Sequence, residues 1–293
     1  MVQALPSNIG IQQVTLKVAD LDKMVNFYTK TIGLKLLKQG EGRAWLAPQG
    51  TNDAILVLKE LTAGEENQGT TGLYHIAFLL PTRKDLGNML LWLLQENVQI
   101  GAADHGYSEA LYLSDPENNG IEIYWDKPEE VWDIRPNGEI IGVTEELDGD
   151  SLAAEADGHW LGISEGSKIG HIHLKVADLD ATETFYKNLG FGLKSNFGQQ
   201  AKFFAAGQYH HHIGTNTWSG KQLPTIQENQ FGLENYTFRL PTAADLEIVQ
   251  ANAEEAKLHF IAKDHLLALE DPSGMIIQFT RSEEHTSELQ SLL

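Results

Sequence analysis

Apolar runs and turn residues alternate clearly between His105 and Trp125. Residues 110–113 (ALYL) predict a strand, residues 115–120 (DPENNG) carry turn chemistry, and residues 121–125 (IEIYW) predict a second strand. Glu122 is the one polar residue of that second strand. Because a buried carboxylate is costly unless a cation or hydrogen bonds satisfy it, Glu122 either binds something or faces water on an exposed sheet face.

The same pattern of apolar and polar positions occurs twice, which indicates an internal repeat. Residues 11–22 (IQQVTLKVADLD) recur as residues 169–180 (IGHIHLKVADLD), and residues 72–82 (GLYHIAFLLPT) recur as residues 232–242 (GLENYTFRLPT). The chain therefore consists of four predicted modules, called A, B, A′ and B′ in chain order. Each module has the pattern of a strand, a helix and then several strands, so we predict an α+β fold with four βαβββ modules.

The two pairs of modules are separated by an acidic segment without clear periodicity. We predict modules A and B at residues 8–127, a linker at residues 128–167, and modules A′ and B′ at residues 168–280. Within the linker, Asn137-Gly138 favours a small hairpin. Residues 281–293 resemble the translation of a DNA-sequencing adapter, so we predict a non-native tail there; the alternative is an ordinary polar C-terminus.

Composition narrows the classes of partner. The chain of 293 residues has a net charge of −20, which argues against binding to a nucleic-acid backbone. No run of about 18 apolar residues is present, so we expect no membrane span. The absence of cysteine means that any metal must be held by nitrogen and oxygen ligands, and it fits a cytoplasmic location. A homo-oligomer is compatible with these features.

Alignment of the modules locates the candidate chemistry. In each module, one residue of the first strand and one residue of the last strand are candidates for facing the same interior. The first-strand residue is, in chain order, Gln13, His75, His171 and Asn235. The position in the last strand is Glu122 in module B and Gln278 in module B′. In module A′ we expect residues 209–213 (YHHHI) to form the last strand, whereas module A has only the apolar residues 54–58 there. Modules B and A′ therefore carry the reactive side chains.

His75, His171 and Glu122 would together offer two imidazoles and one carboxylate. If these three ligands bind one face of a metal ion, three adjacent coordination positions stay open, as expected of non-haem Fe(II) oxygenases. Each histidine alone is more often a packed or hydrogen-bonded core residue, so the prediction depends on the joint pattern. We also expect both imidazoles to bind as neutral rings whose other N–H group is held by an acceptor.

The segment around Glu122 resembles the signature of bacterial extradiol catechol 2,3-dioxygenases, members of the vicinal oxygen chelate (glyoxalase/bleomycin resistance/dioxygenase) superfamily. The matching residues are His105, Leu111-Tyr112, Asp115-Pro116 and Glu122. Ala103, two residues before the histidine, and Asn118, where glycine or proline is usual, depart from it. The resemblance, over residues 8–280, implies two barrels of the superfamily type and Fe(II), or alternatively Mn(II), as cofactor.

This resemblance implies an oxidoreductase that adds O2 to a catechol and opens its ring to a yellow semialdehyde. It implies His212 as the acid/base, by alignment with a pair of histidines in the family; on a strand, His210 and His212 would face one way and His211 the other. His105 and Tyr112 are expected to hydrogen-bond the substrate oxygens, with loop anchoring and core packing as the alternative. His173 and His210 are predicted to contact the substrate.

The placement of the signature is unusual, because most such enzymes have it in the fourth module. Here the fourth module carries Asn235 and Gln278. The ligands His75, Glu122 and His171 come together only if module B pairs with module A′, so we predict that these two form the catalytic barrel. Two other classes remain open: another metalloenzyme of this fold, such as a glyoxalase-like lyase or isomerase, and a binding protein of the bleomycin-resistance kind.

Overall fold

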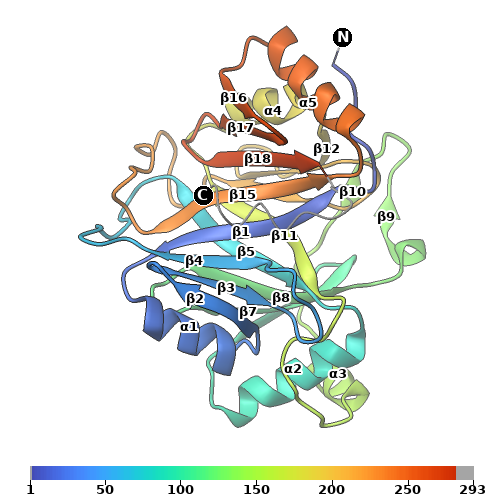
Figure 1. The fold of residues 1–293 in the computed structure, drawn as a ribbon. Coiled ribbons are helices and arrows are strands. Elements are labelled where there is room, and N and C mark those ends of the chain that lie inside the picture. Colours follow the sequence, from blue (N-terminus) through green and yellow to red (C-terminus); the bar gives the residue numbers. More distant parts are fainter. Residues whose placement is uncertain (1, 282–293) are drawn as a thin grey trace.

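The computed structural model describes residues 2–281, in which one order of elements, a strand followed by a helix and three strands, recurs four times (Figure 1). Segment A contains β1 (Gly10–Val18), α1 (Leu21–Lys30), β2 (Lys35–Gly40), β3 (Arg43–Ala47) and β4 (Leu56–Glu60). Segment B contains β5 (Gly72–Leu79), α2 (Arg83–Gln95), β6 (Gly101–Asp104), β7 (Ser108–Ser114) and β8 (Gly120–Asp126). Segment A′ contains β11 (Lys168–Lys175), α4 (Leu179–Asn188), β12 (Gly192–Asn196), β13 (Ala201–Ala205) and β14 (Ile213–Asn216). Segment B′ contains β15 (Gly232–Leu240), α5 (Ala243–Glu255), β16 (Phe260–Lys263), β17 (Leu266–Glu270) and β18 (Ile276–Arg281). The predicted α+β class is confirmed.

The segment between B and A′ packs on the body with little regular structure. Its elements are η1 (Glu129–Val131), β9 (Asp133–Ile134), β10 (Ile140–Ile141) and α3 (Gly149–Glu155). Strands β9 and β10 pair as a hairpin, which confirms the prediction made from Asn137-Gly138. Trp160 stacks on Trp92 of α2, with 5.9 Å between the ring centroids. Of the predicted tail, Arg281 ends β18, and residues 282–293 lie outside the described residues.

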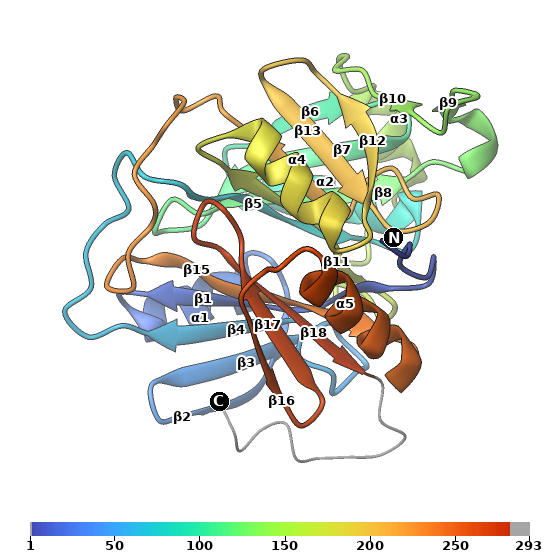
Figure 2. The same cartoon turned by 90° about the horizontal axis from the view of Figure 1, so that it is seen from above.

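Strand pairing follows one rule within segments and another between them. In each segment the first strand pairs in parallel with the last: β1 with β4, β5 with β8, β11 with β14, and β15 with β18. Between segments, β1 pairs antiparallel with β15 and β5 pairs antiparallel with β11 (Figure 2). Strands β1 and β11 pair antiparallel at a single position, where Ile11 is the partner of Ile169. The main order, β16-β17-β18-β15-β1-β11-β5-β8-β7-β6, is an open path, and no closed barrel is found among the described strands.

The repeated sequence VADLD explains where two of the helices begin. Asp20 and Asp178 are the N-cap residues of α1 and α4, and their carboxylates accept hydrogen bonds from backbone N–H groups of the first turn. A side-chain oxygen at this position satisfies donors that the helix itself leaves unpaired. No helix in residues 2–281 combines the length and the apolar character needed to cross a membrane.

Helices α1 and α4 are each attached to an Asp-Pro turn of the next segment. The buried hydroxyl of Tyr28 in α1 donates to Asp115 over 3.0 Å, and that of Tyr186 in α4 donates to Asp271 over the same distance. In the first of these turns, Asn118 has a φ of 63°, a left-handed conformation that asparagine tolerates better than most residues. The turn predicted at residues 115–120 therefore forms with asparagine in the place of glycine.

Candidate metal centre

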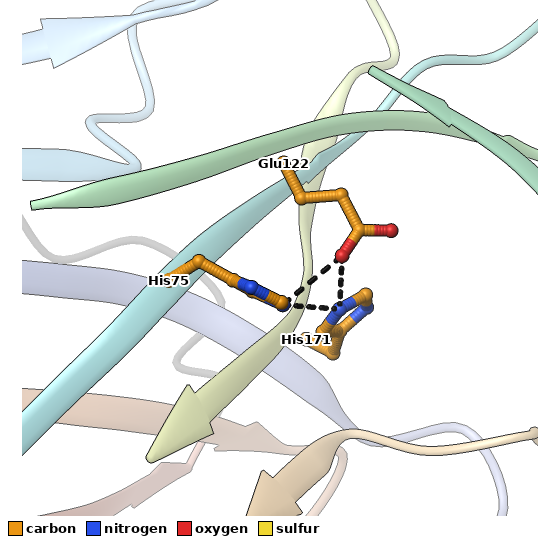
Figure 3. A group of neighbouring side chains, drawn as sticks. All are labelled: His75, Glu122 and His171. Carbon is orange, nitrogen blue, oxygen red and sulfur yellow. Dashed lines mark hydrogen bonds and ion pairs between the residues drawn. The ribbon is translucent and has the colours of Figure 1, made fainter. Parts of the chain in front are cut away.

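Three side chains from three neighbouring strands converge at one point (Figure 3). His75 comes from β5, Glu122 from β8 and His171 from β11. The Nε2 atoms of His75 and His171 are 3.3 Å apart, and they lie 3.0 and 3.1 Å from Oε2 of Glu122. All three residues are buried, and Glu122 is only 3% exposed, so the alternative that it faces water is wrong.

The register of the strands explains this convergence. Ala77 of β5 is the partner of Glu122 on one side and of His171 on the other. Because side chains two residues apart on a strand share a face, His75 lies on the same face of β5 as Ala77. Ala77 therefore has Glu122 on the neighbouring strand on one side and His171 on the other. The third candidate ligand, His75, lies two residues before Ala77 on the same strand.

The electrostatics of the cluster favour a cation. Burial would raise the pKa of Glu122, but His171 and His75 hold that pKa well below its usual range. Burial lowers the pKa of His171 to about 4, although Glu122 opposes this shift. At neutral pH Glu122 is therefore ionised and His171 is neutral. Among the described residues Glu122 has ion-pair contacts only with the two imidazoles, which leaves its buried charge uncompensated by lysine or arginine.

A metal ion fits this donor set. The two nitrogens and the carboxylate oxygen lie within 4.8 Å of one another, and no other such group is found in residues 2–281. Nitrogen and oxygen donors of this kind suit Fe, Mn and Zn. The expected acceptor for the second ring nitrogen is wrong for His171: its Nδ1 is buried and has no hydrogen-bond partner in the described structure, so no acceptor fixes that ring. Packing against neighbouring rings must orient it instead.

His105 and Tyr112 lie beside the cluster and bond to each other. His105 Nδ1 donates to the carbonyl oxygen of Val143 over 2.8 Å, so its Nε2 accepts from the hydroxyl of Tyr112 at 2.5 Å. The Tyr112 ring lies 5.9 Å from that of His75. Burial, together with the charge of Glu122, raises the pKa of Tyr112 well above its ordinary value, so this hydroxyl is a proton donor at neutral pH.

His173 is buried on the other side of His75. Its ring lies 4.9 Å from the His75 ring, and its Nε2 atom is buried without a hydrogen-bond partner among the described residues. Burial and the nearby His75 and His171 lower its pKa, which keeps the ring neutral. The exposed rings of Tyr74 and Trp218 contact His173 and mark the side on which it comes closest to solvent. The sequence pattern did not single out these two aromatic residues.

The histidine triplet does not form a strand as expected. Residues 206–212 run through a turn and loop, and β14 begins only at Ile213. The two-residue alternation assumed for His210 and His212 therefore does not apply. His211 has its ring 4.1 Å from that of His171. His212 instead lies near Tyr209 and Phe238, and its Nδ1 accepts from the backbone N–H of Ala206.

His210 lies behind His211, with both ring nitrogens engaged. Its Nδ1 is 2.8 Å from Nδ1 of His211, and its Nε2 is 2.8 Å from Oδ1 of Asp126. A substrate contact through these nitrogens would require one of these bonds to break. Asp126 was not predicted from the sequence, although residues 122, 124 and 126 of β8 share one face, a signal that the alternation of the strand offers.

The corresponding positions of the other half carry no such cluster. Gln13 pairs with Thr237 as His171 pairs with Ala77, and Gln278 lies beside Thr237 as Glu122 lies beside Ala77. The amide of Gln13 donates to the carbonyl oxygen of Ala54, and Thr237 donates to Gln278. Each of these amides has a hydrogen-bond partner within the protein, and neither stands beside a histidine or carboxylate group of the kind formed by His75, Glu122 and His171 in the described residues.

Comparisons with known proteins agree with this arrangement. The family model described as "Glyoxalase/Bleomycin resistance protein/Dioxygenase superfamily" matches residues 10–123 and 168–279. Catechol-2,3-dioxygenase of Bacillus subtilis (strain 168) is 38% identical over 279 residues, which are 93% of this chain and 97% of that protein. Biphenyl-2,3-diol 1,2-dioxygenase 3 of Rhodococcus globerulus is 27% identical over 124 residues, covering 40% of this chain and 65% of that protein.

Among solved structures, glyoxalase I from Zea mays superposes with a TM-score of 0.57 and 14% identity, and the match covers 94% of this chain and 92% of that one. At this identity the likeness concerns the fold alone. The sequence matches confirm the resemblance that was first inferred from the residues around Glu122.

Proposed function

The chain belongs to the glyoxalase/bleomycin resistance protein/dioxygenase superfamily, and on this premise we propose that it is an Fe(II)-dependent extradiol dioxygenase. It would add both atoms of O2 to a catechol and open the ring next to the hydroxyls, with no external reductant. The observation that carries this proposal is the convergence of His75, Glu122 and His171 in a chain similar over almost its whole length to a catechol-2,3-dioxygenase.

His75, His171 and Glu122 would hold the metal through Nε2, Nε2 and a carboxylate oxygen. Bound Fe(II) would supply a Lewis acid for the catechol oxygens and a redox-active centre for O2. Three protein ligands of this type leave room for both reactants. Mn(II) accepts the same donors, and metal analysis decides between the two.

The neighbouring side chains would bind the substrate and move its protons. We assign His173 to a substrate oxygen, because its Nε2 is a buried polar atom without a partner among the described residues. Tyr112, whose hydroxyl donates to His105, would accept a hydrogen bond from a hydroxyl of the catechol. For the proton acceptor we propose His211 in place of His212, because the ring of His211 is the one that lies against His171.

We further propose that segments B and A′ form the catalytic unit of two superfamily barrels, and that A and B′ form a second unit without metal. The antiparallel pairing of β5 with β11 supports the first, and the pairing of β1 with β15 supports the second. The domain bounds at residues 8–127, 128–167 and 168–280 stay predictions, as do the cytoplasmic location and any homo-oligomer.

The test is an assay of the purified chain, loaded with Fe(II) without air and then mixed with O2 and a catechol. We expect consumption of one O2 for each catechol, together with a yellow ring-opened product, and neither in the metal-free protein. Catechols with different ring substituents should be compared, together with a glyoxalase-type thiol adduct. If an iron-loaded sample consumes no O2 with any catechol, the proposal is wrong; turnover of the thiol adduct alone would favour the glyoxalase class.

A further inference from the structure

A chain of hydrogen bonds leads from His211 away from the metal cluster to a carboxylate. Nδ1 of His211 lies 2.8 Å from Nδ1 of His210, and Nε2 of His210 lies 2.8 Å from Oδ1 of Asp126. Both imidazoles are buried, whereas the side chain of Asp126 is 19% exposed. The residues come from two parts of the chain, since Asp126 ends β8 and the histidines precede β14.

The chemistry of these atoms fixes where the protons lie. A carboxylate only accepts, so Nε2 of His210 carries a proton and donates it to Asp126. In a pair of neutral imidazoles with the proton of His210 on Nε2, Nδ1 of His210 is an acceptor, so Nδ1 of His211 is the donor between the two rings. His211 then has a lone pair on Nε2, and this atom has no hydrogen bond to a described residue.

We propose that Asp126 is a positioning residue that acts through His210 and holds His211 in the tautomer with its proton on Nδ1. The tautomer leaves Nε2 of His211 free to accept a proton at the centre. Which proton it accepts rests on the proposed function, whereas the tautomer itself does not. This assigns a role to both His210 and Asp126 that requires neither of them to touch the substrate.

The rings and hydroxyls around the pair hold it in place. Tyr107 stacks on His210 with 4.4 Å between centroids and 15° between planes, and Phe203 contacts His211 on an edge. Tyr209 donates to the second oxygen of Asp126 over 2.9 Å. Both carboxylate oxygens of Asp126 therefore accept hydrogen bonds, one from His210 and one from Tyr209. The hydroxyl of Tyr124 donates in turn to that of Tyr209. Rotation of Asp126 or of His210 would therefore break several contacts at once.

The half without the metal cluster lacks this device. Ile172 donates its backbone N–H to the carbonyl oxygen of His212, and Val14 donates in the same way to Ile55. The residues that correspond to His210 and His211 are therefore Asp53 and Ala54. The same local backbone forms in segment A without the histidine pair, so the pair is not required to build this part of the fold.

The tautomers can be measured directly by NMR on the full-length chain labelled with 15N in histidine. Spectra would be recorded without added metal and with Zn2+, a diamagnetic occupant for nitrogen and oxygen ligands. His210→Gln and His211→Gln variants assign the signals. We expect the proton of His210 on Nε2 and that of His211 on Nδ1 at neutral pH. A wild-type protein with the proton of His211 on Nε2 would overturn the inference.

Asp126→Asn tests the cause, with Tyr209→Phe as the matched control. Asp126→Asn replaces the carboxylate by an amide that can donate to His210 and so reverse the direction of both bonds, whereas Tyr209→Phe keeps the carboxylate and removes only the bond to its second oxygen. We expect a shift of His211 toward the Nε2–H tautomer in Asp126→Asn, a fall in kcat of at least about tenfold, and little change in KM or bound iron. Tyr209→Phe should keep the wild-type tautomers.

The outcomes separate this inference from the proposed function. Tautomers as expected in a protein that opens no catechol would support the positioning role and contradict the dioxygenase proposal. A wild-type protein that opens catechols, with Asp126→Asn showing unchanged tautomers and kcat, would overturn the positioning role alone. Circular dichroism of each variant shows that the fold is retained, and the wild-type spectra still test the tautomers if Asp126→Asn does not fold.

Discussion

Three imidazole rings, those of His75, His210 and His211, lie within 6.2 Å of the ring of His171, yet their hydrogen bonds give them different roles. His75 points Nε2 at the same carboxylate oxygen as His171. His210 is fully engaged by Asp126 and His211. At the scale of the residue, the free nitrogens therefore identify the groups that can take a metal, a substrate oxygen or a proton.

Phenylalanine substitutions should separate His211 from His212. We expect His211→Phe to bind iron normally and to lose about 10²- to 10⁴-fold in kcat, the usual contribution of a well-placed acid or base. His212→Phe should keep kcat within a few-fold, because its ring lies toward Phe238 and away from the cluster, and should cost about 1–3 kcal/mol of stability through overpacking. Steady-state kinetics with iron analysis measures both, and the reverse ranking would contradict the assignment.

At the scale of the element, the repeats predicted much of the fold. The recurrence of VADLD marks the starts of α1 and α4, and the Asp-Pro turns lie where the sequence placed them. The histidine triplet was assigned to the last strand of module A′ by alignment of the modules, and this assignment is wrong. The chain instead turns at Gly207, with a φ of 63°, and the histidines are held by partners such as Asp126, 84 residues from His210. Local pattern cannot reveal a bond between residues so far apart.

The Asp-Pro turn of segment B′ should make stability depend on pH. Burial raises the pKa of Asp271 to about 6, against 3.8 for the unfolded chain. Between these values the folded state binds more protons than the unfolded state, so the free energy of unfolding falls as pH rises, by up to about 3 kcal/mol from this group.

Asp271→Asn should lack this part of the pH dependence, because the amide does not ionise and its oxygen still accepts from the N–H groups of Ser273 and Met275. Urea unfolding of the wild type and the variant across this pH range measures the difference. Asp53→Asn, at an exposed carboxylate, is the control. Parallel pH profiles for Asp271→Asn and the wild type would show that this carboxyl does not carry the effect.

At the scale of the whole molecule, the site is built from both halves of the chain. Two ligands lie before the linker and His171 lies after it, and the halves meet through the β5–β11 and β1–β15 ladders. No local pattern specifies which segments pair. The sequence indicated the pairing of B with A′ only because His75, Glu122 and His171 can bind one metal ion in no other arrangement of the modules. The linker itself supplies no ligand, so its continuity is needed to connect the halves and not to form the cluster.

Cleavage of the linker should leave the centre intact. A protease site placed in the exposed loop of residues 135–137 would cut between β9 and β10 without touching either ladder. We expect the two pieces to elute together in gel filtration, to separate only in denaturant, and to keep their iron. Loss of iron or separation of the halves on cutting under native conditions would show that the ladders do not hold the halves together.

The most direct test of the central claim is the iron content of His171→Gln after loading with Fe(II). This variant puts into segment A′ the residue that segment A carries as Gln13, so the change in side chain is one that the repeat already accommodates. His159→Gln, at a histidine whose side chain is 83% exposed, is the matched control. The account predicts that His171→Gln loses most of its iron while His159→Gln keeps it, because a three-ligand site without one imidazole no longer holds the ion. Full iron in His171→Gln would contradict a centre shared by the two halves of the chain.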